Sequence, residues 1–180
     1  MFKHIEEISL IKMGEYRVPD FWNGYLKTMT SDALCYITDD VLFVEDTVES
    51  IIEEMISRFS TYDGIIGIEQ YNLPSSQALQ SAFGVIGTKY ADRFPDRKVW
   101  CENYSRFFCD KELWLYANEI GKFHFSDKAR LAHLHPAFTG EKPDYTHKQV
   151  RKHLSKDKET FRQRQEKNLL WGRDFTLLNM

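Results

Sequence analysis

The chain has few cysteines, no long apolar run and little net charge. Its 180 residues include three cysteines, Cys35, Cys101 and Cys109, whose odd number and spacing exclude a disulfide scaffold and a cysteine-based metal knuckle. No apolar stretch approaches the roughly 20 residues of a membrane span, and the first residues lack the apolar segment of a signal peptide. A net charge of -3 argues against a polyanion partner such as nucleic acid. We therefore expect a cytoplasmic protein in a reducing compartment, without a membrane span.

What is present indicates one ordinary globular domain with a basic tail. Hydrophobic residues make up 42% of the chain and charged residues 28%, which is typical of a globular protein. Residues 147–173 differ, because nine Lys or Arg stand there against three acidic residues. We expect a domain over residues 1–146 and a basic helical extension over residues 147–180. The basic face is either solvated or a contact for a phosphorylated ligand or partner.

Hydrophobic periodicity predicts three helices. Apolar residues from Val48 to Phe59 recur at the spacing of one helix face, and Asp46 followed by Glu49 predicts a capping box at its start. The other helices are expected at residues 19–29 and 111–120, the second closed by Gly121. Because residues 32–68 have the pattern of strand, helix and strand, we expect a right-handed parallel crossover.

The strand pattern extends this to a fold class. Further strands are expected at residues 8–13, 82–86, 122–125 and 130–135. The sequence therefore predicts an α/β fold with a mostly parallel central sheet flanked by helices.

The most informative stretch is residues 35–41, where a short apolar run leads directly into Asp39 and Asp40. Two acids at the end of a buried strand need a positive partner, because burying an unpaired charge is costly. The carboxyl ends of strands are also where α/β proteins bind ligands. Paired oxygen ligands in that place suit Mg²⁺ or Mn²⁺ together with a phosphate. The alternative is a solvated turn acid beside a helix cap.

Several motifs, taken in order, resemble those of family 2 glycosyltransferases with the GT-A fold, above all the phage or bacterial branch. The order and the spacing agree over residues 14–136. The motifs are an Asn-Gly element at residues 22–24, a metal-binding strand at 31–41, a Tyr-Ala-Asp-Arg-Phe-Pro element at 90–95, an acidic acceptor-site motif at 109–113, a glycine with a short strand at 121–123, and late histidines at 133–135.

Two departures from the family pattern qualify what is expected. Thr38 and Cys109 stand where the family carries acids. The two strands and the helix that hold the nucleotide's base and ribose are also missing before Asp39. The resemblance therefore implies a GT-A-like domain truncated at its N-terminal edge.

The resemblance implies a role for each acid and histidine. Asp40 would bind Mn²⁺ or Mg²⁺, and His133 or His135 would be a further ligand on the metal or diphosphate side. Asp39 would hold a metal-bound water or the ribose of the nucleotide-sugar donor. The cation would neutralise charge on the departing diphosphate. Asp110 would be the general base of an inverting displacement; its alternative role is a helix N-cap, and that of the histidines is structural.

Three more residues are assigned to substrate binding. Glu112 would assist in binding the acceptor, or else lie solvated in the first turn of its helix. Asn23 belongs to the Asn-Gly element. Trp100 would stack on a sugar ring, although the usual place of such an aromatic is the core.

Three classes of function remain open at this point. The first is a metal-dependent glycosyltransferase that moves a sugar from a nucleotide-sugar donor to an acceptor hydroxyl. The second is a non-catalytic GT-A-like binding or structural module, and the third is a metal-dependent hydrolase, which lacks a defined nucleophile. Because truncation would leave a sheet edge uncovered, we also expect a homo-oligomer, in the form of a twofold dimer.

Overall fold

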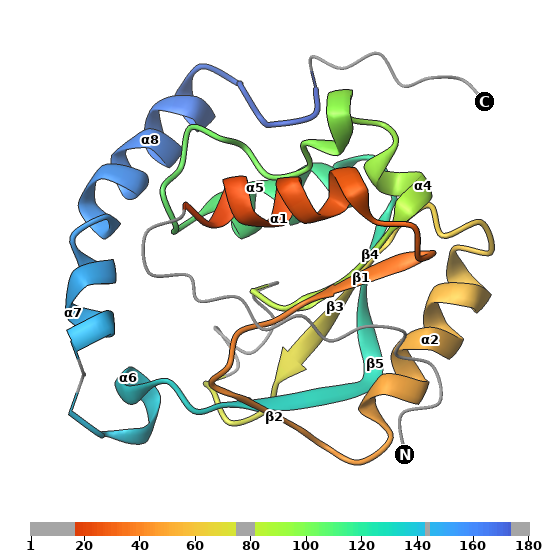
Figure 1. The fold of residues 1–180 in the computed structure, drawn as a ribbon, viewed down its shortest axis with the longest axis horizontal. Helices are drawn as coiled ribbons and strands as arrows, with labels where there is room; N and C mark the ends of the chain where they lie inside the picture. The colour runs from red at the N-terminus through yellow and green to blue at the C-terminus, as the bar shows by residue number, and fades with distance from the viewer. Residues whose placement is uncertain (1–16, 75–81, 143–144, 174–180) are drawn as a thin grey trace.

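The computed structural model describes residues 17–74, 82–142 and 145–173, which form a curled five-stranded sheet with helices around it (Figure 1). The order of the strands across the sheet is β1-β4-β3-β5-β2. The strands are β1 (Ala33–Tyr36), β2 (Val41–Phe43), β3 (Ile65–Gln70), β4 (Gly84–Gly87) and β5 (Phe123–His133).

The sheet is mixed and mostly antiparallel, so the prediction of a mostly parallel central sheet is wrong. Among the described strands, only β3 and β5 pair in parallel, and the other three pairings are antiparallel. β1 and β3 run in the same direction as a crossover requires, but the chain between them contains β2 as well as α2 (Thr47–Arg58), and β4 lies between them in the sheet. The strand–helix–strand pattern of the sequence does not reveal this inserted strand.

Glycines make the insertion of β4 sterically feasible. A Cβ atom on Gly84 would lie 2.5 Å from the carbonyl oxygen of Ile66, and one on Gly87 would lie 1.9 Å from that of Tyr62. Both separations are far inside van der Waals contact, so the backbones approach as closely as they do only because neither residue carries a side chain.

The three predicted helices are confirmed. They are α1 (Val18–Thr28), α2 and α5 (Cys109–Glu119), and Gly121 ends α5 with a φ of +68° as expected. The capping box is wrong: Asp46 has left-handed backbone, and its side chain makes no cap hydrogen bond within the described residues. The Thr47 hydroxyl instead bonds the Arg130 carbonyl at 2.7 Å, which fastens the start of α2 to β5.

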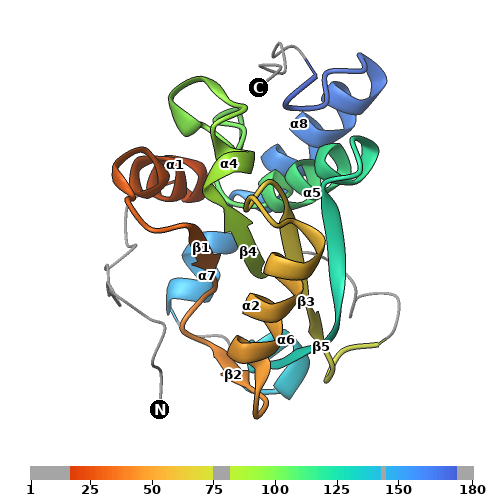
Figure 2. The same ribbon diagram turned by 90° about the vertical axis from the view of Figure 1, so that its right-hand side faces the viewer.

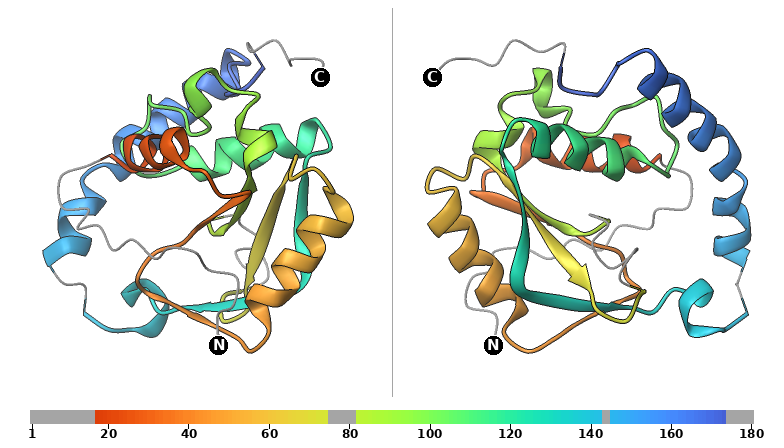
Figure 3. Two further views of the ribbon diagram at one scale, coloured as in Figure 1. Left: turned by 45° about the vertical axis from the view of Figure 1, so that its right-hand side comes forward. Right: turned by 180° about the vertical axis from the view of Figure 1, so that it is seen from behind.

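β5 is one long bent strand where the sequence predicts two short ones (Figure 3). Its register with β3 jumps at a bulge, because Gly67 pairs with Phe125 whereas Glu69 pairs with Arg130. The Ser126 hydroxyl accepts the N–H of Ala129 at 2.6 Å and holds the bulge in place. The residues between the two predicted strands, 126–129, therefore belong to β5, and the bend carries the end of β5 across to β2. The strand predicted at residues 8–13 lies outside the described residues.

The core lies on both faces of the sheet. Ile65 and Ile66 are neighbours on β3 and point to opposite sides, Ile65 into one cluster with α1 and α5 and Ile66 into another with α2. Figure 1 shows α2 to the right of the sheet and α1 and α5 above it, and Figure 2 shows α1 and α5 on either side of α4. Short helical turns complete this part of the fold at α4 (Thr88–Ala91), η1 (Pro95–Arg97) and α6 (Pro136–Thr139).

The basic tail forms two helices, α7 (Tyr145–Arg151) and α8 (Leu154–Glu166), rather than one. α8 packs against the globular part, because Phe161 is buried in the same cluster as α1 and α5. Asp157 on α8 is fully buried as well. The tail is thus attached to the body by both apolar and polar contacts.

Candidate functional site

The start of β2 and the end of β5 bring two of the predicted metal ligands together. Val41 pairs with His133 across the two strands, and the N–H of Leu134 donates to the Asp40 carbonyl at 2.7 Å. In this register Asp40 Oδ2 lies 3.3 Å from His133 Nε2. Two residues that are far apart in the sequence thus form one pair at the end of the sheet.

The ring of His133 is held from several sides. Its Nδ1 lies 2.8 Å from Gln70 Oε1, within hydrogen-bond distance, and its Nε2 faces Asp40. The side chain of Asn72 bonds both the N–H and the carbonyl of His133, at 2.8 and 2.9 Å, and the Phe83 ring stands edge-on at 4.9 Å. A metal-binding histidine typically has its second nitrogen fixed in this way.

Asp40 is ionised and lies within electrostatic range of an arginine. Burial opposes its charge, but hydrogen bonds to His133 and to the Thr38 hydroxyl hold the pKa of Asp40 well below its ordinary value. Burial also lowers the pKa of Arg106, whereas the negative charges of Asp40 and Asp39 raise it. The guanidinium of Arg106 is therefore close enough to both carboxylates to interact with their charges.

The loop that carries Arg106 is organised by α8. The buried carboxylate of Asp157 accepts three backbone N–H groups, from Ser105 at 2.9 Å and from Arg106 and Phe107 at 2.8 Å each. Sequence reasoning missed both Arg106 and Asp157. The one available signal was the position of Asp157 between Lys156 and Lys158 in a basic helix. That pattern is compatible with a buried carboxylate as well as with a solvated one.

His135 lies beside this pair but is not a third ligand of it. Its ring is 5.6 Å from that of His133 and 4.6 Å from that of His147 on α7. Burial and the two neighbouring imidazoles lower the pKa of His135. Within the described ranges, ligand atoms of Asp40, His133 and His135 do not all come within 4.8 Å of one another. The protein side therefore offers two ligands here, with His135 next to them.

Asp110 is in the first turn of α5, and its environment alters its acidity. The residue at the N-cap position is Phe108, so Asp110 is not the N-cap. Burial raises the pKa of Asp110 to about 6, although backbone N–H groups of Lys111 and of Asp110 itself favour the charged form and part of the residue stays exposed. The thiol of Cys109 donates to the Arg106 carbonyl at 3.4 Å, so the start of α5 adjoins the Arg106 loop.

The other predicted substrate-binding residues have structural contacts. Asn23 pairs with the backbone of Trp100 through two hydrogen bonds of 2.8 and 2.9 Å, and Trp100 itself is buried in the core. The Glu112 carboxylate is also buried and accepts hydrogen bonds from the Tyr104 hydroxyl, from Arg164 and from the N–H of Trp171. These three residues position α1 and α5 rather than present polar atoms to a ligand.

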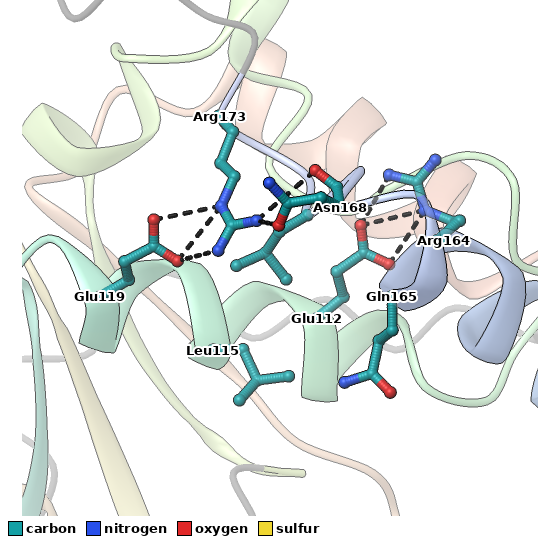
Figure 4. Close-up of a pocket in the computed structure, with 8 residues that line it drawn as sticks. Glu112, Leu115, Glu119, Arg164, Gln165, Asn168 and Arg173 are labelled. Atoms are coloured by element: carbon teal, nitrogen blue, oxygen red, sulfur yellow. Dashed lines mark hydrogen bonds and ion pairs between the residues drawn. The ribbon is translucent and has the colours of Figure 1, made fainter.

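A pocket of about 230 Å³ lies between α5 and the segment around the end of α8 (Figure 4). Its charged side chains are paired with one another: Arg164 with Glu112 at 2.6 Å and Arg173 with Glu119 at 2.5 Å. The arrangement is an ion-pair network that joins the tail to α5, and it leaves Asp40 and its neighbours as the candidate site.

Comparisons with family models, curated proteins and solved structures found no match to this chain. The resemblance to family 2 glycosyltransferases therefore depends on the motifs in the sequence, and the functional argument depends on the geometry above. None of the described helices is both long and apolar enough to cross a membrane.

Proposed function

We propose that the chain is a divalent-cation-dependent glycosyltransferase that uses a nucleotide-sugar donor. The observation that carries this proposal is the pair of Asp40 and His133, an ionised carboxylate and a fixed imidazole whose facing atoms are 3.3 Å apart. Ligand atoms around one ion are about 3 Å apart when the metal–ligand bonds are about 2.1 Å long. The pair therefore suits one Mn²⁺ or Mg²⁺ ion with little movement.

A two-ligand site fits this class of substrate. Mg²⁺ and similar ions are commonly held by one or two protein groups, with substrate phosphates and water completing the shell. When bound, the ion would neutralise charge on the departing diphosphate. Arg106 would add a guanidinium on the same side, which pairs well with phosphate oxygens. The exposed Asp39 would bind the donor's ribose or an ordered water, and His135 would line the diphosphate side.

Asp110 would act as the general base. In an inverting displacement the acceptor hydroxyl attacks the anomeric carbon, loses its proton to the base, and displaces the nucleoside diphosphate. A carboxyl group with a pKa near 6 accepts a proton at neutral pH more readily than an ordinary aspartate. Because the start of α5 adjoins the Arg106 loop, Asp110 would approach the acceptor from the side of that loop.

A second candidate is a binding module without catalysis. Two hollows of about 230 and 280 Å³ lie between α5 and α8 and beside α1, and neither is lined by Asp39, Asp40 or Asp110. Because these two hollows do not adjoin the acids, they offer no enclosed place for an acceptor beside the cation, which favours binding of a nucleotide and a cation alone.

We propose in addition that the protein is cytoplasmic and forms a homo-oligomer. β1 and β2 are the edge strands of the described sheet, and Leu42 on β2 is 60% exposed. An exposed apolar edge favours pairing with a second copy, and twofold symmetry is the commonest arrangement. Light scattering at micromolar concentration tests this, and a monomer would contradict it.

Calorimetry with Mn²⁺ tests the site. Mn²⁺ should bind weakly alone and more tightly with UDP or GDP present, and Asp40→Asn or His133→Gln should abolish the difference. Asp46→Asn is a matched control, because it removes one exposed acid close in sequence to the site and Asn tolerates the left-handed backbone there.

Turnover separates the two candidates. Wild type should transfer sugar from a nucleotide-sugar donor, and Asp110→Asn should reduce the rate by about 10²–10⁴ without any fall in melting temperature. Coupled binding of metal and nucleotide without turnover of any donor would favour the binding module. Unchanged Mn²⁺ binding in Asp40→Asn would remove Asp40 from the site.

A further inference from the structure

A second cluster of potential ligands lies where α2 packs against the bulge of β5, on different residues from the Asp40 site. Glu54 comes from α2, and His124 and Asp127 come from β5. One ligand atom from each lies within 4.8 Å of the other two. His124 Nε2 and Asp127 Oδ2 are 3.6 Å apart, which is too long for a hydrogen bond but close to the spacing of two ligands on one ion.

Two atoms of this cluster are buried without a partner. Glu54 is 8% exposed, and its Oε1 accepts the N–H of Asp127 at 3.2 Å. Its Oε2 has no hydrogen-bond partner among the described residues, and the same holds for the buried Nε2 of His124. Buried polar atoms in native proteins almost always have a partner. A divalent cation would bind the carboxylate oxygen and the imidazole nitrogen together, and the Asp127 carboxylate is near enough to join them.

We propose that Glu54, His124 and Asp127 form a site for a divalent transition-metal ion of the Zn²⁺ class. One imidazole nitrogen and two carboxylate oxygens are ligands that Zn²⁺ takes in a tetrahedral arrangement, with a water molecule in the fourth position. Bonds of about 2.0–2.1 Å at tetrahedral angles place ligand atoms about 3.3 Å apart, so small side-chain rotations complete the site. Mg²⁺ sites usually depend on substrate phosphates and several waters and Ca²⁺ sites on six or more oxygens, so this compact set of one imidazole and two carboxylates suits a transition metal better.

The site would fasten the sheet to α2. The bulge that carries Asp127 interrupts the β3–β5 pairing, and α2 covers that face through Ile51 and Met55. A bound ion would join these elements at the point where the sheet has lost its regular hydrogen bonds. Because the ion binds the folded state, it would raise the melting temperature by mass action.

Arg58 gives the proposal a distinctive consequence. Its Nη2 lies 3.1 Å from Asp127 Oδ2, so the cation of Arg58 competes with the metal for one of the three ligands. Replacing Arg58 with Gln should therefore tighten Zn²⁺ binding, which an ordinary ion-pair cluster would not do.

The experiment begins with the full chain stripped by a chelator. Zn²⁺ titrated by calorimetry should bind one equivalent at this cluster, and melting with and without Zn²⁺ should show a rise. Co²⁺ in place of Zn²⁺ should give the visible absorbance of a tetrahedral site. Glu54→Gln and His124→Gln should each weaken Zn²⁺ binding by more than about tenfold, the lower end of what a mere supporting residue costs.

Controls keep the outcomes distinct. Glu53→Gln removes an acid from the same helix, but Glu53 is 71% exposed, so binding should be unchanged. Asp127→Asn should also weaken Zn²⁺ binding, and because Asp127 is exposed this substitution should not disturb folding. It therefore tests the site even if Glu54→Gln fails to fold. Asp40→Asn should leave this equivalent of Zn²⁺ in place, so failure of the proposed transferase site and of this one are separable. No Zn²⁺ binding by wild type, or equal binding by Asp127→Asn and Arg58→Gln, would overturn the proposal.

Discussion

Removing Arg164 measures how strongly the C-terminal helix is attached to the body. Glu112 is 1% exposed and the side chain of Arg164 is 12% exposed, and their N···O distances are 2.6–3.0 Å. Burial opposes the charge of Arg164, but Glu112 outweighs it and raises the pKa of Arg164. Arg164→Met would leave the Glu112 carboxylate buried with the Tyr104 hydroxyl and the Trp171 N–H. Breaking a buried ion pair costs about 3–5 kcal/mol, and because two donors remain we expect about 3 kcal/mol.

Urea and thermal unfolding test this number. At about 2–4 °C per kcal/mol for a chain of this size, the melting temperature should fall by about 6–12 °C. Adding Glu112→Gln to Arg164→Met should restore part of the loss, because it removes the uncompensated charge. Arg162→Met on the same helix is the control, since Arg162 pairs at the surface and its loss should be too small to resolve. A loss below about 0.5 kcal/mol for Arg164→Met would refute the reasoning.

Three further predictions follow from buried or crowded groups. Asp157→Asn should destabilise the fold by about 2–4 kcal/mol in urea unfolding, because its amide N–H₂ would face N–H donors of residues 105–107. Unchanged stability would mean that the loop keeps its conformation without the Asp157 carboxylate. Gly87→Ala should greatly reduce the folded fraction seen by circular dichroism, because its Cβ would meet the Tyr62 carbonyl at 1.9 Å, and a native melting curve would contradict this. Burial raises the pKa of Asp110 from 3.8 to about 6, so the ionised carboxylate destabilises the native state. Asp110→Asn should therefore become more stable than wild type as the pH rises from about 4 to above 6. Equal effects of the substitution on melting temperature at low and high pH would disprove this.

Local patterns were sufficient to predict the three helices α1, α2 and α5. The apolar face of α2 has a period that only a helix satisfies, and Gly121 marks the end of α5 because no other residue adopts its backbone as readily. The failed capping box has an equally local cause. Asp46 adopts left-handed backbone instead of the extended backbone of a capping residue, and the start of α2 is held by the hydrogen bond of Thr47 to β5.

The sheet could not be predicted because its order depends on long-range contacts. β4 fits between β1 and β3 through close backbone approach at Gly84 and Gly87, and the atoms that come close belong to Ile66 and Tyr62. In the sequence these glycines indicate only flexible backbone. β5 likewise appears as two strands because the bulge at Ser126 has the composition of a turn, and only its register with β3 shows that the strand continues.

The candidate site shows the same division between local and long-range information. Asp40 and His133 could be singled out because each stands at the end of a strand pattern, and the β2–β5 register then brings them into contact. Arg106 has no such pattern, and its position depends on a carboxylate from another helix, Asp157, that binds three consecutive backbone N–H groups. For Glu112 the local pattern is misleading. An acid in the first turn of a helix is equally suited to a substrate site, but Glu112 is buried and paired with Arg164 of α8. A polar side chain that the sequence places at a helix start is therefore assigned to ligand or to core by its distant partners, and in this protein α8 supplies those partners.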